Sequence, residues 1–339
     1  MKSKKVLVTG GAGYIGSHTV VELLQRGYEV AIVDDLSKSD QMLLSGIEKI
    51  AGKKPIFYKG DCCDKKFMQT LFKTEKGIDC VMHFAAYKSV GESVQLPLDY
   101  YRNNIGSLVT VLEVMKENNI QDFIFSSSCT VYGQPDHIPV NETAPFKKAE
   151  SPYGATKQMG ERILEDAYKT GLRIISLRYF NPIGAHPSAL IGELPIGVPN
   201  NLLPYITQTA TGKRDKLTIF GDDYNTPDGS CLRDYIHVVD IADAHIKAME
   251  HLSKLPPGNV CDVFNLGTGV GVSVLELVKK FEKVNDIKLN YVIGARRPGD
   301  VEKVYADPEK IRKALGWKTR FTIEEALQHA WQWEQKISS

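Results

Sequence analysis

A glycine-rich turn near the N-terminus constrains this chain more than any other feature of its sequence. The apolar run Val6–Thr9 leads directly into Gly10, Gly13 and Gly16, and apolar residues with helical spacing follow. In a strand that turns sharply into a helix, such glycines permit the turn, the approach of the backbone to a diphosphate, and close helix–strand packing. The free N–H groups at the start of the helix then attract phosphate oxygens. The spacing therefore predicts a strand–turn–helix unit that binds a dinucleotide.

An acidic residue follows the second apolar run, Glu29–Val33. This residue, Asp34, lies 24 residues after Gly10. A carboxylate at this place accepts hydrogen bonds from a ribose 2′-hydroxyl and repels a 2′-phosphate, so we expect NAD rather than NADP. Asp61 follows a third run, Ile56–Lys59, and is interpreted either as facing the adenine ring or as an ordinary loop carboxylate.

Short β-rich runs alternate with helical stretches through the first half of the chain. Further apolar runs lie at Cys80–Ala85, Phe123–Phe125 and Arg173–Leu177, and Tyr100–Asn118 carries apolar residues at helical spacing. Continuous apolar runs of this length are typical of strands buried on both faces of a parallel sheet. The alternation predicts an α/β fold with a doubly wound, parallel Rossmann-type sheet.

The composition and the hydrophobic pattern of the sequence change near residue 181. Residues 182–234 are rich in Pro, Gly and Asn, and regular helical patterns return at Ile241–Leu252, Val274–Val284 and Thr322–Ile337. Because 339 residues exceed the usual size of one domain, we expect two domains, or one large α/β domain with an appended lobe. The boundaries that follow are those of the two-domain interpretation. The first is an NAD-binding Rossmann domain over residues 1–180, and the second is a smaller C-terminal α/β substrate-binding lobe over residues 181–339. Later elements of the second region can pack back on the first domain.

Charge and composition exclude several classes of protein. The chain has 42 Lys and Arg against 41 Asp and Glu, and a net charge of +1 argues against a protein that coats nucleic acid or an anionic membrane. No apolar run approaches the length of a membrane span, and no signal-peptide core precedes Val6. Six scattered cysteines without a CxxC pair argue against a disulfide framework or a metal site. We expect a cytoplasmic enzyme with no metal and no nucleic-acid or membrane partner.

Tyr153 and Lys157 are four residues apart, which places both side chains on one face of a helix. Tyrosine has a pKa of about 10 and is a poor base at neutral pH. A nearby ammonium group and a positively charged nicotinamide ring favour the phenolate, which makes the tyrosine a usable proton shuttle. The run Ser126–Ser128 ends a predicted strand, where a hydroxyl can orient the substrate oxygen. The spacing alone is common on solvated helix faces, but beside the glycine-rich turn and Asp34 it predicts catalysis.

Seven stretches of the chain together resemble the extended short-chain dehydrogenase/reductase superfamily and, within it, the UDP-glucose 4-epimerase (UDP-galactose 4-epimerase) family. They are VTGGAGYIGSH (Val8–His18), KSVGESV (Lys88–Val94), FIFSSSCTVYG (Phe123–Gly133), SPYG (Ser151–Gly154), LRYFNPIGAHP (Leu177–Pro187), PNNLLPY (Pro199–Tyr205) and RDYIHVVD (Arg233–Asp240). The resemblance covers nearly the whole chain. It implies reversible epimerisation of UDP-galactose and UDP-glucose at the sugar C4, through a transient 4-keto sugar and with tightly bound NAD.

The resemblance also implies roles for individual residues. Tyr153 would be the base, Lys157 would lower its pKa and bind the nicotinamide ribose, and Ser128 would hold the reacting hydroxyl. The residues assigned to the cofactor are Gly10, Gly13, Tyr14, Ile15, Gly16, Asp34, Asp35, Leu36, Ser37, Asp61, Cys62, Phe84, Ala85, Ala86, Lys88, Asn103, Ser128, Tyr153, Lys157 and Phe180. The residues assigned to the substrate are Lys88, Ser128, Thr130, Tyr153, Tyr179, Phe180, Asn181, Asn200, Asn201, Leu202, Thr218, Ile219, Phe220, Arg233, Tyr235, Arg297, Asp300 and Val304.

Two other functions share these motifs. Related sugar-nucleotide 4,6-dehydratases carry an adjacent Asp-Glu pair where this chain has Cys129 and Thr130, so elimination would lack its acid. A non-catalytic NAD-binding scaffold commonly lacks the tyrosine or the lysine, and this chain has both. Arg233 and Arg297 suit a diphosphate because guanidinium groups bind phosphate with paired hydrogen bonds, but both can instead be surface charges in salt bridges.

The resemblance bears on substrate range and assembly as well. In the family, a bulky tyrosine just downstream of the Arg297–Asp300 motif restricts the site to UDP-glucose and UDP-galactose, and a smaller residue admits N-acetylated sugars. The matching residue here is Val304, so we expect UDP-N-acetylhexosamines to be substrates too. A homodimer is implied as well, through helices at residues 100–118 and 154–169, although burial within one monomer explains their apolar faces equally.

Overall fold

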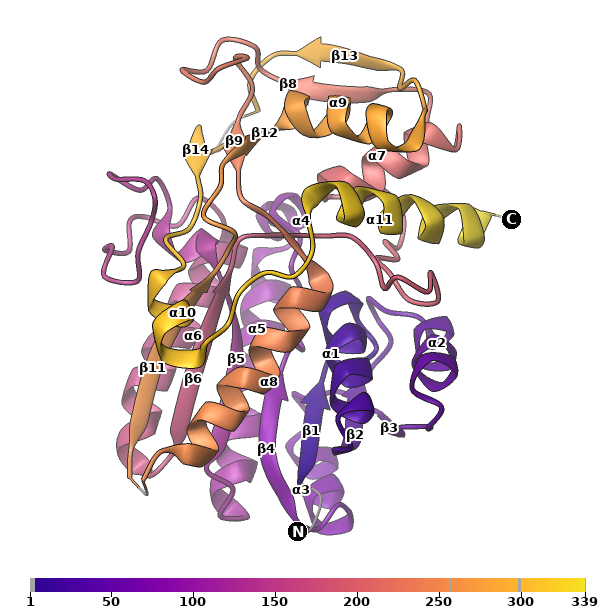
Figure 1. Cartoon of the computed structure of the whole chain (residues 1–339). Coiled ribbons are helices and arrows are strands. Elements are labelled where there is room, and N and C mark those ends of the chain that lie inside the picture. The colour runs from indigo at the N-terminus through magenta and orange to yellow at the C-terminus, as the bar shows by residue number, and fades with distance from the viewer. Residues whose placement is uncertain (1–3, 257, 298–299, 339) are drawn as a thin grey trace.

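A computed structural model of the chain describes residues 4–256, 258–297 and 300–338. Seven strands within these ranges form one sheet, in the order β11 (Val260–Leu266), β6 (Arg173–Tyr179), β5 (Asp122–Ser128), β4 (Ile78–His83), β1 (Lys5–Thr9), β2 (Glu29–Asp34) and β3 (Ile56–Lys59). All neighbouring strands in this sheet run parallel. The predicted fold class, a doubly wound Rossmann-type α/β fold, is confirmed (Figure 1).

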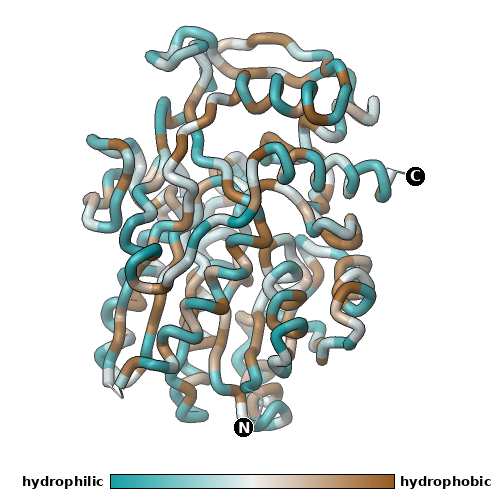
Figure 2. The backbone as a smooth tube through the Cα atoms, in the orientation of Figure 1, coloured by the Kyte–Doolittle hydropathy of each residue, from teal (hydrophilic) through white to brown (hydrophobic). Residues whose placement is uncertain are grey.

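Helices cover both faces of the sheet because side chains alternate along each strand. In β1, Val6 and Val8 pack in one apolar cluster and Leu7 packs in another. The first cluster includes residues of α1 (Tyr14–Gln25), α2 (Gln41–Ala51), α8 (Val238–Lys254) and α10 (Glu309–Leu315). The second includes residues of α3 (Lys65–Thr74), α5 (Pro97–Glu117) and α6 (Pro152–Ala167). Figure 2 shows hydrophobic residues in runs along the central strands, as this two-sided burial requires.

The remaining elements lie mainly above the carboxyl ends of the strands in Figure 1. They are α4 (Val90–Gln95), the 3₁₀ helices η1 (Cys129–Tyr132) and η2 (Tyr168–Thr170), β7 (Asn181–Ile183), α7 (Leu202–Ala210), β8 (Leu217–Phe220), β9 (Leu232–Arg233), β10 (Tyr235–His237), β12 (Val272–Ser273), α9 (Val274–Asn285), β13 (Tyr291–Gly294), β14 (Lys303–Val304) and α11 (Ile323–Ser338). Short sheets join β7 with β10, β8 with β13, and β9 with β12 and β14.

The chain returns to the first sheet after residue 181. Strand β11 pairs with β6, and α8 packs against α1, so these later elements complete the Rossmann-type layers. The division into domains at residue 180 stays a prediction. No helix in the described ranges is long and apolar enough to cross a membrane.

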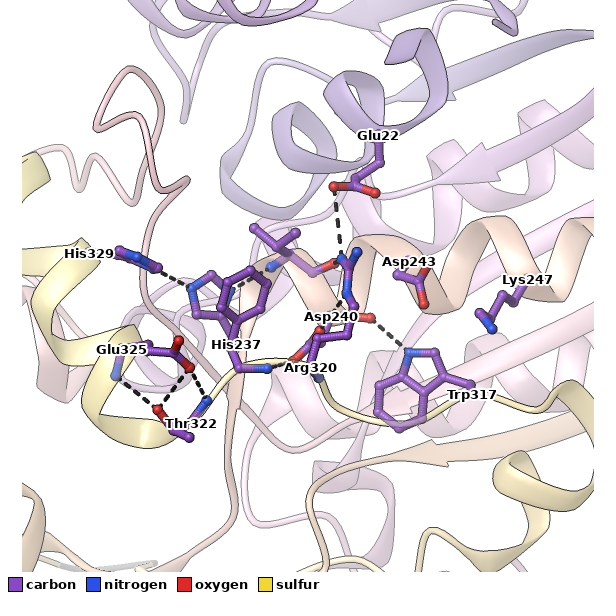
Figure 3. Close-up of polar contacts among 12 residues, drawn as sticks. Glu22, His237, Asp240, Asp243, Lys247, Trp317, Arg320, Thr322, Glu325 and His329 are labelled. Atoms are coloured by element: carbon purple, nitrogen blue, oxygen red, sulfur yellow. Dashed lines mark hydrogen bonds and ion pairs between the residues drawn. The ribbon is translucent and has the colours of Figure 1, made fainter. Parts of the chain in front are cut away.

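A buried carboxylate attaches the C-terminal segment to α8 (Figure 3). Asp240 accepts hydrogen bonds from the backbone N–H groups of Arg320 and Phe321 at 3.0 and 3.2 Å, and from Arg320 Nε at 3.2 Å. The indole of Trp317 donates to the carbonyl of Asp240 at 3.0 Å. These bonds fix the path of the chain from α10 to α11, the helix that packs against α7 and α9.

The order of the strands reverses between β1 and β4. The chain proceeds from β1 to β2 and β3 on one side and from β4 to β11 on the other. In open α/β sheets, ligands bind in the crevice at the carboxyl ends of the strands beside such a reversal. The fold therefore predicts a ligand-binding site formed by the loops that follow β1 and β4.

Candidate active site

A cavity of about 410 Å³ lies at this crevice. Its walls come from the carboxyl ends of the strands, from the turn before α1, and from the loop that precedes α7. The predicted cofactor residues that line it are Gly10, Gly13, Tyr14, Ile15, Gly16, Asp34, Asp35, Ser37, Asp61, Cys62, Phe84, Ala85, Ala86, Lys88, Asn103, Ser128, Tyr153, Lys157 and Phe180. Leu36 is the one member of that set outside the lining, between two residues that belong to it.

The glycines after β1 form a cradle that larger residues would fill. Gly10 has a φ of +69°, and a Cβ there would lie 2.7 Å from the backbone nitrogen of Ala85. A Cβ on Gly16 would lie 2.2 Å from the carbonyl oxygen of Gly10. Gly13 precedes α1, and no side chain caps that helix. The start of α1 is thus presented to the cavity, and its shape and dipole fit the diphosphate of a dinucleotide.

Asp34 both lines the cavity and fixes the glycine-rich turn. Its buried carboxylate accepts hydrogen bonds from the N–H groups of Ala12 and Leu36, at 3.0 and 2.9 Å, and from the hydroxyl of Ser39 at 2.7 Å. Burial raises the pKa of Asp34, although these bonds oppose the effect. A carboxylate offers about four lone-pair positions, so one remains for a ribose hydroxyl.

The predicted catalytic residues meet in this cavity. Helix α6 begins at Pro152, and the hydroxyl of Ser151 accepts a hydrogen bond from the N–H of Gly154 at 3.1 Å. This cap starts the helix one residue before Tyr153 and so presents Tyr153 and Lys157 to the carboxyl end of β5. Ser128 ends β5 and lines the same cavity.

Burial controls the pKa values of the Tyr153 and Lys157 side chains. It raises the pKa of Tyr153 to about 12, with the Ser128 hydroxyl acting in the opposite direction. It lowers the pKa of Lys157 to about 8, opposed by the charge of Glu161. The depression of the tyrosine pKa that the sequence predicts is therefore not produced by the protein groups. The ammonium group of Lys157 instead donates to the carbonyl of Ser126 at 2.6 Å.

The serine run alternates between the cavity and the core. Ser126 and Ser128 line the cavity, whereas the hydroxyl of Ser127 donates to Glu161 on α6. The guanidinium of Arg178 on β6 also donates to Glu161, at 2.6 Å. Neither Glu161 nor Arg178 is singled out by the sequence. The only local sign of Glu161 is its position four residues after Lys157.

The predicted substrate residues fall into two groups. Those that line the cavity are Lys88, Ser128, Thr130, Tyr153, Tyr179, Phe180, Asn181, Asn200 and Asn201. Those outside its lining are Leu202, Thr218, Ile219, Phe220, Arg233, Tyr235, Arg297, Asp300 and Val304. The hydroxyl oxygen of Thr130 is buried without a hydrogen-bond partner in the described ranges, as expected for a group that meets a ligand.

Several residues of the second group form a cluster of their own. A carboxylate oxygen of Asp300 lies 2.6 Å from Arg297 and 3.7 Å from Arg233. The Arg297 guanidinium lies 5.6 Å from the centre of the Phe220 ring. Both arginines therefore form salt bridges, which the sequence left open as the alternative to a diphosphate-binding role. Each arginine still has further N–H donors for a ligand. Pro298 and Gly299 of the motif lie outside the described residues.

The positions that distinguish an epimerase from a dehydratase lie in η1, directly after Ser128. Burial raises the pKa of the Cys129 thiol to about 12, so this side chain is a neutral thiol at physiological pH. Thr130 supplies a hydroxyl and no acid. Val304 belongs to the same apolar cluster as Val131 and Phe180, and of these three residues only Phe180 lines the cavity.

Comparison with known proteins agrees with this geometry. The model of the NAD dependent epimerase/dehydratase family matches residues 6–267, from β1 to the end of β11. This chain belongs to that family. A UDP-glucose 4-epimerase of Yersinia enterocolitica is 48% identical over 332 residues, which make up 97% of each chain. The resemblance to UDP-glucose 4-epimerases in the sequence is confirmed.

Solved structures of family members superpose closely on this chain. A UDP-glucose 4-epimerase of Stenotrophomonas maltophila, with bound NAD and formylated UDP-arabinopyranose, has a TM-score of 0.95 and 46% identity, with 99% of each chain covered. The enzyme of Bifidobacterium longum, in complex with NAD+ and UDP, has a TM-score of 0.94 and 45% identity at the same coverage. These relatives hold the two classes of ligand that the cavity and the arginine cluster suit.

Proposed function

We propose that this chain is an NAD-dependent UDP-glucose 4-epimerase that interconverts UDP-galactose and UDP-glucose. The observation that carries the proposal is the meeting of Tyr153, Lys157 and Ser128 in one cavity with the glycine cradle and Asp34. NAD held in this cavity would supply the hydride acceptor at the sugar C4 and the hydride donor for the other face of the 4-keto sugar, so no reductant would be consumed. The 48% identity to enzymes of this name over nearly the full chain supports the proposal.

The residues of the chain supply the proton chemistry and the orientation. Tyr153 takes the proton of the C4 hydroxyl and later returns it, while the hydroxyl of Ser128 holds the reacting oxygen. Lys157 binds the nicotinamide ribose and places a positive charge near the tyrosine. Since burial raises the pKa of Tyr153 to about 12, the positive nicotinamide ring is the further charge that favours its phenolate.

The UDP-sugar extends from the cavity to the arginine cluster. Thr130 and Asn181 contact the sugar, and Asn201 contacts the diphosphate at the start of α7. Arg233 and Arg297 bind the nucleotide portion with the N–H groups that Asp300 leaves available. A 4,6-dehydratase is disfavoured because Cys129 and Thr130 provide no carboxylic acid beside the sugar.

A direct assay tests the proposed function. The purified protein is denatured to release NAD, and the native protein is given UDP-galactose without added reductant. The expected results are about one NAD per chain and formation of UDP-glucose. Bound NAD without turnover would favour a scaffold, and a 4-keto-6-deoxy product would favour a dehydratase.

We infer that the enzyme is a cytoplasmic homodimer. Large apolar side chains are exposed on α4, α5 and α6, among them Val94 (62%), Leu98 (72%) and Met159 (47%). Apolar surface on adjacent helices is typical of a face that a partner covers. A single species of monomer mass at micromolar concentration, measured by analytical ultracentrifugation, would contradict this assembly.

UDP-N-acetylhexosamines are proposed as further substrates, and Val304→Tyr tests this. The larger ring fills space near the sugar C2, so the variant should lose most of its turnover of UDP-N-acetylglucosamine and keep that of UDP-galactose. The measurement is kcat/KM for both substrates. Val304→Ala, which leaves the space open, is the matched control and should keep both activities. An equal loss of both in the tyrosine variant would contradict the proposed pocket.

A further inference from the structure

One carboxylate in the cavity bonds to Lys88 and Asn201, which the sequence resemblance assigns to the substrate, Lys88 being assigned to the cofactor as well. Glu193 Oε1 accepts hydrogen bonds from Lys88 Nζ at 2.8 Å and from Asn201 Nδ2 at 2.5 Å. Lys88 follows β4 on the cofactor side of the cavity, and Asn201 precedes α7 on the opposite side. Glu193 therefore joins the two sides through groups that suit a diphosphate.

The backbone of Glu193 is held in place by α11. The indole nitrogen of Trp333 donates to the carbonyl oxygen of Glu193 at 2.9 Å. A Cβ on the preceding residue, Gly192, would lie 2.5 Å from the Trp333 ring, so the chain passes directly against the indole. The Glu193 side chain is only 11% exposed. The Glu193 backbone is thus anchored to α11, and its carboxylate lies in the cavity wall, largely shielded from solvent.

The place that Glu193 occupies suits an anion. Asn201 is the residue before α7, yet its side chain does not cap the helix and turns to Glu193 instead. The start of α7 favours negative charge, and Lys88 adds a cation. A diphosphate that uses Lys88 and Asn201 must therefore share them with the carboxylate or take them from it, against the repulsion between the two negative groups.

We propose that Glu193 is an internal competitor of the substrate diphosphate for Lys88 and Asn201. This inference rests on the proposed function. The substrate and the product of a 4-epimerase carry the same diphosphate, so tight binding of that group slows release as much as it favours capture. A carboxylate that bonds to Lys88 and Asn201 as the nucleotide leaves lowers nucleotide affinity and speeds product release.

Glu193→Gln separates charge from hydrogen bonding, because the amide oxygen can still accept both bonds. We expect the NAD-containing variant to bind UDP about five- to tenfold more tightly in calorimetry, an effect between that of an exposed ion pair and that of a fully buried one. Stopped-flow release of UDP should slow, and both KM for UDP-galactose and kcat should fall. Adding Lys88→Met should remove most of this gain, since the competition requires the cation.

Glu92→Gln is the matched control. Glu92 lines the same cavity and pairs with a lysine, Lys38, at 2.7 Å, but it contacts no residue assigned to the substrate. Its UDP affinity should stay within about twofold of the unmodified enzyme, which would exclude a general charge effect. Equal NAD content in Glu193→Gln and Glu92→Gln checks their folding, and an unchanged urea midpoint checks that of the variant with Lys88→Met, because Lys88 is also assigned to the cofactor.

Unchanged or weaker UDP binding in Glu193→Gln would overturn the inference, because the charge would then not compete. Weaker binding in Glu193→Ala in that case would show that the residue only ties the loop to Lys88 and Asn201. If the unmodified protein binds UDP and epimerises UDP-galactose, this result counts against the inference alone. If it does neither, the proposed function fails first.

Discussion

Replacing Tyr153 with phenylalanine is expected to lower kcat by about 10²–10⁴-fold while NAD stays bound. The ring is buried, so the phenylalanine keeps its packing and only the hydroxyl that moves the proton is lost. Because Tyr153 is the proposed base in both directions, the loss should be the same for UDP-galactose and UDP-glucose. Initial rates with each sugar, together with the NAD content of the denatured protein, measure the effect.

Tyr87→Phe provides the control for this variant. Tyr87 lines the same cavity and is half-buried, but it has no assigned part in the reaction. Its turnover should remain within about twofold of the unmodified enzyme. Near-normal turnover in Tyr153→Phe would refute the base assignment, and a loss of activity that parallels a loss of NAD would indicate a structural role.

The strands of the first half could be predicted because each is a short apolar run buried on both faces. The end of β5 shows the limit of that signal. The apolar pattern stops at Phe125, whereas the strand continues to Ser128 and pairs with Leu177–Tyr179 of β6. Polar side chains continue this strand because Ser126 and Ser128 face the cavity and Ser127 has a buried partner on α6. Tertiary contacts thus outweigh local preference.

The shared placement of the proposed catalytic residues was predictable because their spacing is local, and other parts of the candidate site were not. Tyr153 and Lys157 are one helical turn apart and can be recognised in a short window. Glu193 and Lys88 form their bond across 105 residues of sequence, and no local pattern indicates it. The arginine cluster was predictable only in part. Its charge could be read from the sequence, but the bonds of Arg233 and Arg297 to Asp300 depend on the folded chain.

A buried ion pair one helical turn from Lys157 ties α6 to the sheet. Glu161 lies one turn after Lys157, and Arg178 lies on β6, with both side chains 6% exposed and a contact of 2.6 Å between them. Glu161 also accepts from Ser127, and Arg178 donates to the hydroxyl of Tyr132 at 2.8 Å. The pair thus joins β6 to α6, β5 and η1, which carry Lys157, Ser128 and Thr130.

Arg178→Met is expected to lower the free energy of unfolding by about 3–5 kcal/mol, because it leaves the Glu161 carboxylate buried without its cation. Urea unfolding measures the change. The double variant with Glu161→Met should recover much of this loss, since both buried charges are then absent. Arg162→Met, which removes an arginine of α6 that is 70% exposed, should leave the urea midpoint unchanged. A midpoint for Arg178→Met equal to that of Arg162→Met would show that the pair does not hold the helix. If the double variant regains stability while its kcat stays low, the ion pair positions Tyr153 and Lys157 against β5 as well as stabilising the fold.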